Sequence, residues 1–155
     1  MTTAERLVKV LTEKKLTCAT AESCTGGGVG YAITGVAGSS AVFKGGTICY
    51  VDSAKHGVLG VPKEVLATKG AVSSERAATM AGCARWNTDL TVAVTDIAVP
   101  SGGSAEKPEG LVWFGLASKY SVTTEKKIFS GDREAVRTAA IEHALALLLE
   151  EAIRP

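Results

Sequence analysis

Short segments rich in β-branched and apolar residues alternate along this sequence with segments of helical periodicity. The strand-like segments are 17–21, 47–51, 90–98, 111–117 and 122–129. Helices are expected at about 4–15, from Gly28 to near Gly35, around Lys55, after Pro62, from an N-cap at Ser73 to about Ala84, and at 132–153. Such alternation favours a β-sheet placed between helical layers. With 155 residues, 46% of them hydrophobic, the chain suits one domain, 1–155.

The first and last helices carry the clearest local signals. Thr2-Thr3-Ala4-Glu5 is a capping-box pattern, in which the threonine and glutamate side chains bind backbone N–H groups at the helix start. Pro62 can open a helix, because its missing N–H costs nothing at a first helical position. The closing helix has an apolar stripe, formed by Val136, Ala139, Ala140, His143, Ala144, Leu147 and Leu148.

Charge and cysteine content exclude several classes of protein. Seventeen Lys and Arg residues against sixteen Asp and Glu residues give a net charge of +1, so charge gives no indication of nucleic-acid binding. Four cysteines without C-x-x-C spacing are typical of reduced thiols. No apolar run is long enough to cross a membrane, and the N-terminus lacks a signal-peptide pattern. We therefore expect a cytoplasmic protein that binds neither nucleic acid nor membrane, and the apolar helices permit a homo-oligomer.

The segment from Ala21 to Gly28 lies between a strand-like run and a helical one, where α/β enzymes commonly place chemistry. The turn from Ser23 to Gly27 would present free N–H groups at the positive end of the helix dipole. Such groups can hold a phosphate, a carboxylate or the oxyanion of a reacting amide. An ordinary N-cap turn would use the same residue types, and the dinucleotide, P-loop and Gly-x-Ser-x-Gly motifs are absent.

Few residues could assist a nucleophile in this turn. His56 and His143 are the only histidines; His143 fits a core or subunit-contact position, and His56 fits the surface. Cys24 could act as a nucleophile at a helix N-terminus, but no base is evident beside it. Ser23 could use a lysine base, for which Lys55 is the candidate if burial lowers its pKa from about 10.4. The long loop from Pro100 to Gly110 suits either a lid or a flexible surface segment.

Several motifs in fixed order resemble one protein family over nearly the whole chain. They are Ala21-Glu22-Ser23-Cys24-Thr25-Gly26-Gly27, Ala37-Gly38-Ser39-Ser40, Tyr50-x-x-x-x-Lys55, Gly70-Ala71-Val72-Ser73, Gly102-Gly103-Ser104 with Lys107-Pro108, and Phe129-Ser130-Gly131-Asp132-Arg133. The family is that of the CinA C-terminal domain, which includes stand-alone nicotinamide-nucleotide amidases. This resemblance implies a three-layer α/β/α sandwich with a mixed sheet.

The resemblance also implies an activity, namely hydrolysis of nicotinamide mononucleotide to nicotinic acid mononucleotide and ammonia in pyridine-nucleotide salvage, without metal or organic cofactor. Ser23 would be the nucleophile and Lys55 its base, with Tyr50 and Ser40 supporting the pair. The remaining positions implied to bind substrate are Thr25, Gly26 and Gly27 through their backbone, Thr95, and Arg133 or Arg137 at the phosphate.

The sequence departs from the family pattern near the implied site. Thr95-Asp96-Ile97-Ala98-Val99-Pro100 has Asp96 and Val99 where the family commonly has glycine. Asp52 replaces an asparagine and could pair with Lys55, which would keep the lysine protonated. A paralogue that binds a nucleotide without turnover is therefore the alternative hypothesis, with hydrolysis of another small amide or a structural role behind it.

Overall fold

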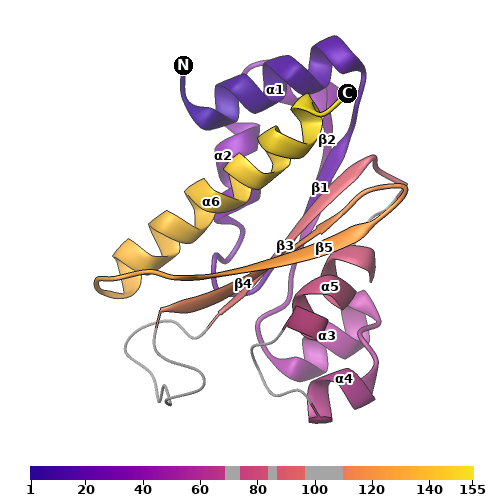
Figure 1. The fold of residues 1–155 in the computed structure, drawn as a ribbon, viewed down its shortest axis with the longest axis vertical. Helices are drawn as coiled ribbons and strands as arrows, with labels where there is room; N and C mark the ends of the chain where they lie inside the picture. The colour runs from indigo at the N-terminus through magenta and orange to yellow at the C-terminus, as the bar shows by residue number, and fades with distance from the viewer. Residues whose placement is uncertain (69–73, 84–86, 97–109) are drawn as a thin grey trace.

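A five-stranded mixed sheet forms the middle layer of the protein (Figure 1). The structure is a computed structural model that describes residues 1–68, 74–83, 87–96 and 110–155. The strands are β1 (Cys18–Glu22), β2 (Phe43–Ile48), β3 (Leu90–Asp96), β4 (Leu111–Ala117) and β5 (Val122–Ile128). Their order is β2-β1-β3-β4-β5, with β2, β1 and β3 parallel and β4 and β5 antiparallel to their neighbours. The mixed sheet confirms the predicted fold class.

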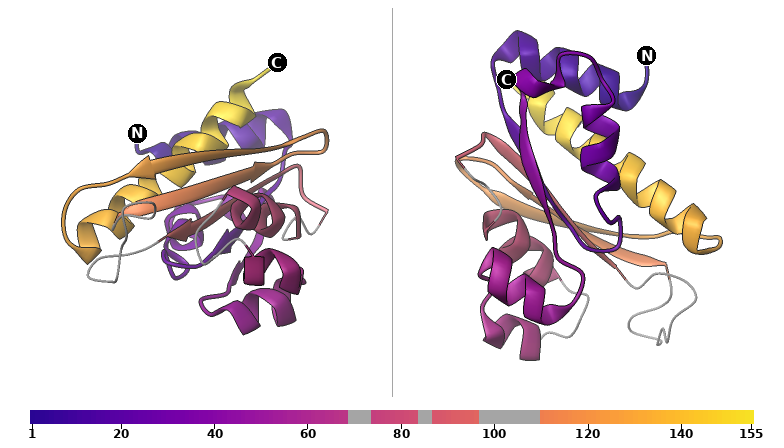
Figure 2. Two further views of the ribbon diagram at one scale, coloured as in Figure 1. Left: turned by 60° about the horizontal axis from the view of Figure 1, so that its bottom comes forward. Right: turned by 180° about the vertical axis from the view of Figure 1, so that it is seen from behind.

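Helices cover both faces of this sheet (Figure 2). One face carries α1 (Thr3–Lys14), α2 (Gly28–Thr34) and α6 (Arg133–Ile153); the other carries α3 (Asp52–Leu59), α4 (Lys63–Thr68) and α5 (Ser74–Cys83). A short 3-10 turn, η1 (Ser39–Ala41), precedes β2. None of the helices in the described ranges is long and apolar enough to cross a membrane.

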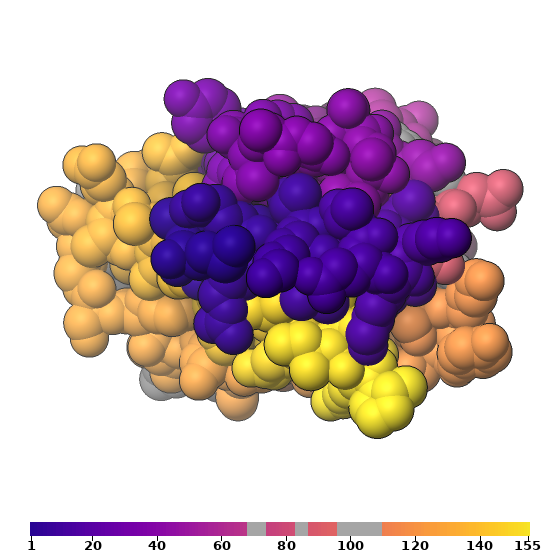
Figure 3. Space-filling view, turned by 90° about the horizontal axis from the view of Figure 1, so that it is seen from above, coloured from indigo at the N-terminus to yellow at the C-terminus, as the bar shows by residue number. Residues whose placement is uncertain are grey.

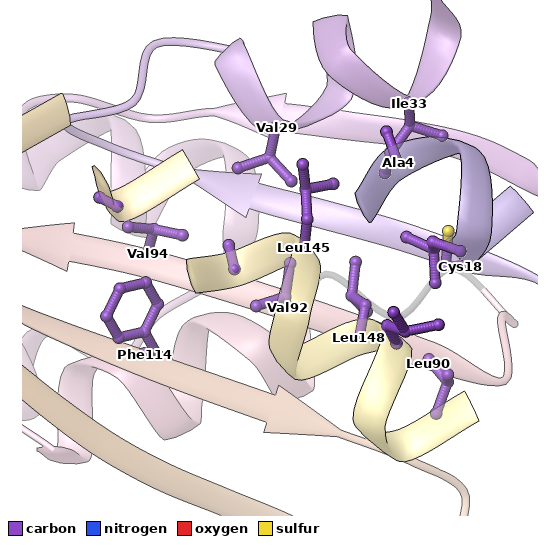
Figure 4. Packing of buried hydrophobic residues seen from close by; sticks show 14 of the residues in the cluster. Ala4, Cys18, Val29, Ile33, Leu90, Val92, Val94, Phe114, Leu145 and Leu148 are labelled. Atoms are coloured by element: carbon purple, nitrogen blue, oxygen red, sulfur yellow. The ribbon is translucent and has the colours of Figure 1, made fainter. Parts of the chain in front are cut away.

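The larger core lies beneath α1, α2 and α6 (Figure 4). Leu7 and Leu11 of α1 are fully buried there, as are Val92 and Val94 of β3 and Leu148 of α6. Burial also raises the pKa of the Cys18 thiol to about 12, so this thiol stays protonated and packs as an apolar group. A smaller cluster beneath α3 to α5 includes Ala21, Val61 and Met80.

Helices α1 and α6 lie side by side (Figure 3), and contacts at both of their ends show that they run in the same direction. The hydroxyl of Thr3 donates to the carboxylate of Glu142, and Lys14 Nζ donates to the carbonyl oxygens of Ile153 and Arg154 at 3.0 and 2.9 Å. The α1 start is the predicted capping box, with both Thr2–Glu5 hydrogen bonds at 3.1 Å.

The strand predicted at 47–51 is misplaced, because β2 runs from Phe43 to Ile48. Gly45 and Gly46 are typical of a turn, which hides this strand in the sequence. Gly46 instead lies where any side chain would overlap the hydroxyl of Thr20 on β1, so glycine permits the two strands to approach. As a result Cys49 and Tyr50 follow the strand rather than belonging to it.

Candidate active site

The turn after β1 is held by a buried carboxylate. Glu22 is 1% exposed, and its Oε1 accepts from the Thr25 hydroxyl at 2.7 Å and from Val29 N at 2.9 Å. Its Oε2 accepts from the Thr20 hydroxyl and from Gly30 N, both at 3.0 Å. The carboxylate therefore satisfies the first N–H groups of α2 and fixes the turn that carries Ser23.

This arrangement leaves few N–H groups available for the predicted anion site at the helix start. Gly26 N donates to Ser23 O at 3.1 Å and Gly28 N to Thr25 O at 2.9 Å, while Glu22 occupies the next two N–H groups. Across the described part of the chain, the N–H groups of Thr25 and Gly27 make no hydrogen bond. These two N–H groups are the ones left to meet an oxyanion.

Ser23 and Thr95 lie side by side at the carboxyl ends of their strands. Ser23 N donates to Val94 O at 3.1 Å, which places Ser23 against the neighbouring strand beside Thr95. Both side chains are buried, Ser23 to 6% exposure and Thr95 to 1%. The carboxyl end of parallel strands is where open α/β sheets bind their ligands.

Lys55 lies on α3 at the same end of the sheet and is only 3% exposed. Burial lowers its pKa from the ordinary 10.5, and the nearby Arg76 charge lowers it further, while Asp52, Cys24 and Cys49 oppose the shift. Cys24 is next to Ser23 in the chain, and Cys49 N donates to Glu22 O at 2.9 Å. Lys55 is therefore a buried lysine with a lowered pKa that interacts electrostatically with Cys24, the residue after Ser23.

Asp52 forms the predicted ion pair with Lys55, but its opposing effect leaves the pKa of Lys55 lowered. Its carboxylate is 3.9 Å from Lys55 Nζ but accepts hydrogen bonds from both terminal nitrogens of Arg76, at 2.6 and 3.1 Å. The hydrogen bond from Arg76 is the main reason that the pKa of Asp52 is lowered.

Two arginines of α6 reach the same region from the other face. Arg137 Nε donates to Cys24 O at 2.9 Å, and its guanidinium borders Gly26, where φ is +59°. Arg133 donates to the Tyr50 hydroxyl at 3.0 Å, and Tyr50 is 59% exposed. The start of α6 thus brings two cations to the Ser23 turn and to Tyr50, as the predicted phosphate role requires.

Ser40 is not brought to this region within one chain. It lies in η1, before Phe43, which pairs with Cys18 at the opposite end of β1. Four residue steps of a strand cover about 13 Å. The predicted hydrogen bonding of Ser40 with the Ser23–Lys55 pair is therefore wrong within a single chain.

Two functional candidates were missed from the sequence, Glu22 and Arg76. Glu22 had a signal, since a carboxylate just before a helix start is well placed to bind its N–H groups. Arg76 had one too, because it shares the apolar stripe of α5 with Ala77, Met80 and Ala81. Val99 and the side chain of Asp96 lie outside the described part of the structure, as do Ser73 and most of the 100–110 loop.

Both histidines have structural contacts. His143 packs against the Phe114 ring, with centroids 4.7 Å apart, and its Nε2 is 3.3 Å from a Glu125 oxygen. His56 Nδ1 is 2.8 Å from Val61 O. In the described ranges no group of three or more His, Cys, Asp or Glu side chains could hold a metal ion.

Known proteins are similar to this chain in sequence and in fold. Residues 1–152 match the model of the CinA C-terminal domain family. The nicotinamide-nucleotide amidohydrolase PncC of Enterobacter agglomerans is 50% identical over 142 residues, which cover 90% of this chain and 85% of the relative. A CinA-like protein of Geobacter sulfurreducens is 47% identical over 90% of this chain but only 34% of its own length.

Solved structures agree with the match to this family model. A competence/damage inducible protein from Agrobacterium tumefaciens superposes with a TM-score of 0.92 at 41% identity, over 96% of this chain and 92% of the other. A CinA superfamily protein from Escherichia coli gives 0.91 at 34% identity, over 96% and 88%. The chain nevertheless spans about a third of several longer curated relatives, for example 35% of a Thermoanaerobacter protein.

Proposed function

The chain belongs to the CinA C-terminal domain family, and on that premise we propose that it hydrolyses the carboxamide of nicotinamide mononucleotide to a carboxylate and ammonia. The observation that supports this proposal is a buried lysine with a lowered pKa, which interacts electrostatically with Cys24, the residue after the buried Ser23. The amidohydrolase name of the Enterobacter agglomerans relative supports the choice of substrate.

In this mechanism Ser23 Oγ attacks the carboxamide carbon while Lys55 Nζ accepts the hydroxyl proton. The N–H groups of Thr25 and Gly27 would stabilise the oxyanion of the tetrahedral intermediate. Lys55 then gives its proton to the amide nitrogen, so that ammonia leaves and an acyl-enzyme remains. Lys55 then accepts a proton from water, which attacks this ester, and returns that proton to Ser23 Oγ as nicotinic acid mononucleotide leaves.

The nucleotide phosphate would bind near Arg133 and Arg137, which are placed at Tyr50 and at the Ser23 turn. A guanidinium fork matches phosphate oxygens well. Tyr50 would hold Arg133 through the hydrogen bond described above, and Thr95 would border the reacting group. The predicted homo-oligomer is also part of this proposal. Ser40 could take part at the site only if it came from a second copy of the chain.

Ammonia release from nicotinamide mononucleotide tests the proposal. We expect Ser23→Ala and Lys55→Ala each to reduce kcat by on the order of 1000-fold or more. The exposed Ser121→Ala and Lys44→Ala are matched controls that should retain wild-type rates. A Ser23→Ala protein with unchanged activity would refute the mechanism. Wild-type protein that binds the nucleotide in a calorimetric titration without releasing ammonia would favour the binding-only alternative.

A further inference from the structure

Three charged side chains form a connected cluster beneath the candidate site. Asp52 and Lys55 lie one turn apart on α3, with 3.9 Å between Lys55 Nζ and Asp52 Oδ1. Arg76 reaches the same carboxylate from α5, with hydrogen bonds of 2.6 Å to Oδ1 and 3.1 Å to Oδ2. The cluster therefore contains two cations and one anion.

The cluster is built around the arginine rather than the lysine. Arg76 is 1% exposed, and one of its terminal nitrogens also donates to Leu66 O at 2.5 Å. Its guanidinium meets both oxygens of Asp52, and such a two-point contact is the strongest geometry for an ion pair of this kind. Lys55 lies beyond hydrogen-bonding distance of the same carboxylate. Asp52 is therefore hydrogen-bonded to Arg76 and forms only a longer ion pair with Lys55.

We propose that Arg76 is a positioning residue, which engages the Asp52 carboxylate so that Lys55 stays available as the proton acceptor for Ser23. The inference rests on the proposed function, because it assigns Lys55 the role of base. It goes beyond that function in giving a task to two residues that do not touch the substrate.

Among the residues that the structure describes, the charged and titratable groups near Lys55 fit this assignment. From its own helix come Asp52 and the neighbouring His56, whose Nδ1 is 2.8 Å from Val61 O. Arg76 comes from α5, and the Cys24 and Cys49 thiols come from the ends of β1 and β2. Burial and then Arg76 lower the pKa of Lys55, and the opposing effect of Asp52 is smaller than either.

Removal of Arg76 alone should raise the pKa of Lys55. In Arg76→Leu the Asp52 carboxylate loses its partner and can turn to Lys55, which would then stay protonated to higher pH. We expect the acid limb of the kcat/KM profile to move to higher pH. At neutral pH the rate should fall by on the order of tenfold, with recovery in more alkaline buffer.

The double variant Asp52→Asn/Arg76→Leu separates this role from a purely structural one. It removes both charges of the pair, which is tolerated far better than leaving one unpaired. We expect its acid limb to lie between those of Arg76→Leu and wild type, with partial recovery of activity at neutral pH, because Arg76 lowers the pKa of Lys55 by more than Asp52 raises it. If Arg76 only supported packing, the double variant would be as impaired as Arg76→Leu, and neither acid limb would move.

The titration of Lys55 can also be followed without any substrate. Protein labelled with ¹³C at the lysine Cε carbons reports each ammonium by NMR, and Lys55→Arg identifies the Lys55 signal. Lys55 should titrate at higher pH in Arg76→Leu than in wild type and at an intermediate pH in the double variant. The exposed Arg154→Leu is the matched control.

Identical Lys55 titrations in wild type and Arg76→Leu would overturn the inference, even if activity changed. A shift as expected in protein that releases no ammonia would instead refute the proposed substrate and leave the role of Arg76 standing. If Arg76→Leu does not fold, as judged by circular dichroism, Arg76→Gln provides the comparison with the same double-variant design.

Discussion

Glu22 is the residue on which the candidate site most depends without touching a substrate. Its carboxylate accepts four hydrogen bonds, two from hydroxyls and two from the backbone of α2. Removing it would leave several buried donors unsatisfied, and each such donor costs about 1–3 kcal/mol. The turn that carries Ser23 would lose its anchor at the same time.

We therefore expect Glu22→Ala to lower the free energy of unfolding by roughly 3 kcal/mol or more and to reduce kcat. Urea denaturation and the ammonia assay measure the two effects. The control is Glu13→Ala, which removes an exposed carboxylate of α1. A loss of stability no greater than that of the control would contradict the anchoring role.

Lys55 gives the protein a pH-dependent stability of defined sign. Its pKa is lower in the folded chain than the ordinary 10.5, chiefly because of burial. The unfolded chain then binds more protons between these two pKa values, so the contribution of Lys55 to stability rises with pH across that window. Below the window the buried ammonium is a cost to the folded state.

We expect Lys55→Met to be more stable than wild type at neutral pH, with the difference shrinking as the pH approaches 10.5. Urea denaturation over this pH range provides the measurement. A difference that stays constant with pH would show that packing, rather than titration, decides the effect.

At the residue scale the sequence singled out Ser23 and Lys55, both of which are buried, but not the residues that surround them. Their motifs are local, and the carboxyl ends of parallel strands meet at one edge of a sheet. The contacts of Glu22 and Arg76 depend on how elements far apart in the chain pack, and spacing does not encode this. The prediction for Ser40 was wrong for the same reason, since its motif does not indicate the end of the sheet at which it lies.

At the scale of elements, the packing of α5 on β4 depends on one glycine. A side chain at Gly115 would overlap the carbonyl oxygen of Ala77, so α5 can approach the sheet this closely only over glycine. The same helix carries Arg76 toward Asp52. The strand β4 itself was predicted with its observed bounds from an apolar run, Leu111 to Ala117, that includes Trp113 and Phe114.

Gly115→Ala should therefore destabilise the protein by about 1–3 kcal/mol and also weaken the Arg76–Asp52 contact. Thermal unfolding measures the first effect, and the acid limb of the rate profile reports the second. Gly57→Ala in α3, where a methyl group meets nothing within 4 Å, is the matched control and should be neutral or slightly stabilising. Equal melting temperatures for the two variants would argue against the close approach.

At the scale of the whole molecule, protection should decrease from the centre of the sheet to its edge. β3 lies between β1 and β4, and its residues from Val92 to Thr95 are 1% exposed or less. β5 forms one edge and is exposed along nearly its whole length. Exchange is slowest where opening requires global unfolding.

We expect backbone amides of β1 and β3 to exchange slowest with solvent deuterium and those of β5 to exchange faster. Hydrogen exchange read by NMR, residue by residue, provides the test. Protection in β5 equal to that in β3 would mean that another surface covers this edge in solution. Such a result would support the predicted homo-oligomer.

The parallel packing of α1 against α6 also has a practical consequence. Because Lys14 binds the carbonyl oxygens of Ile153 and Arg154, the end of the chain lies near the amino end of β1, away from Ser23. A polymer bead, an electrode or a fluorescent reporter attached at Pro155 would lie away from the candidate site at Ser23. Pro155 is thus a suitable attachment point for immobilising the protein.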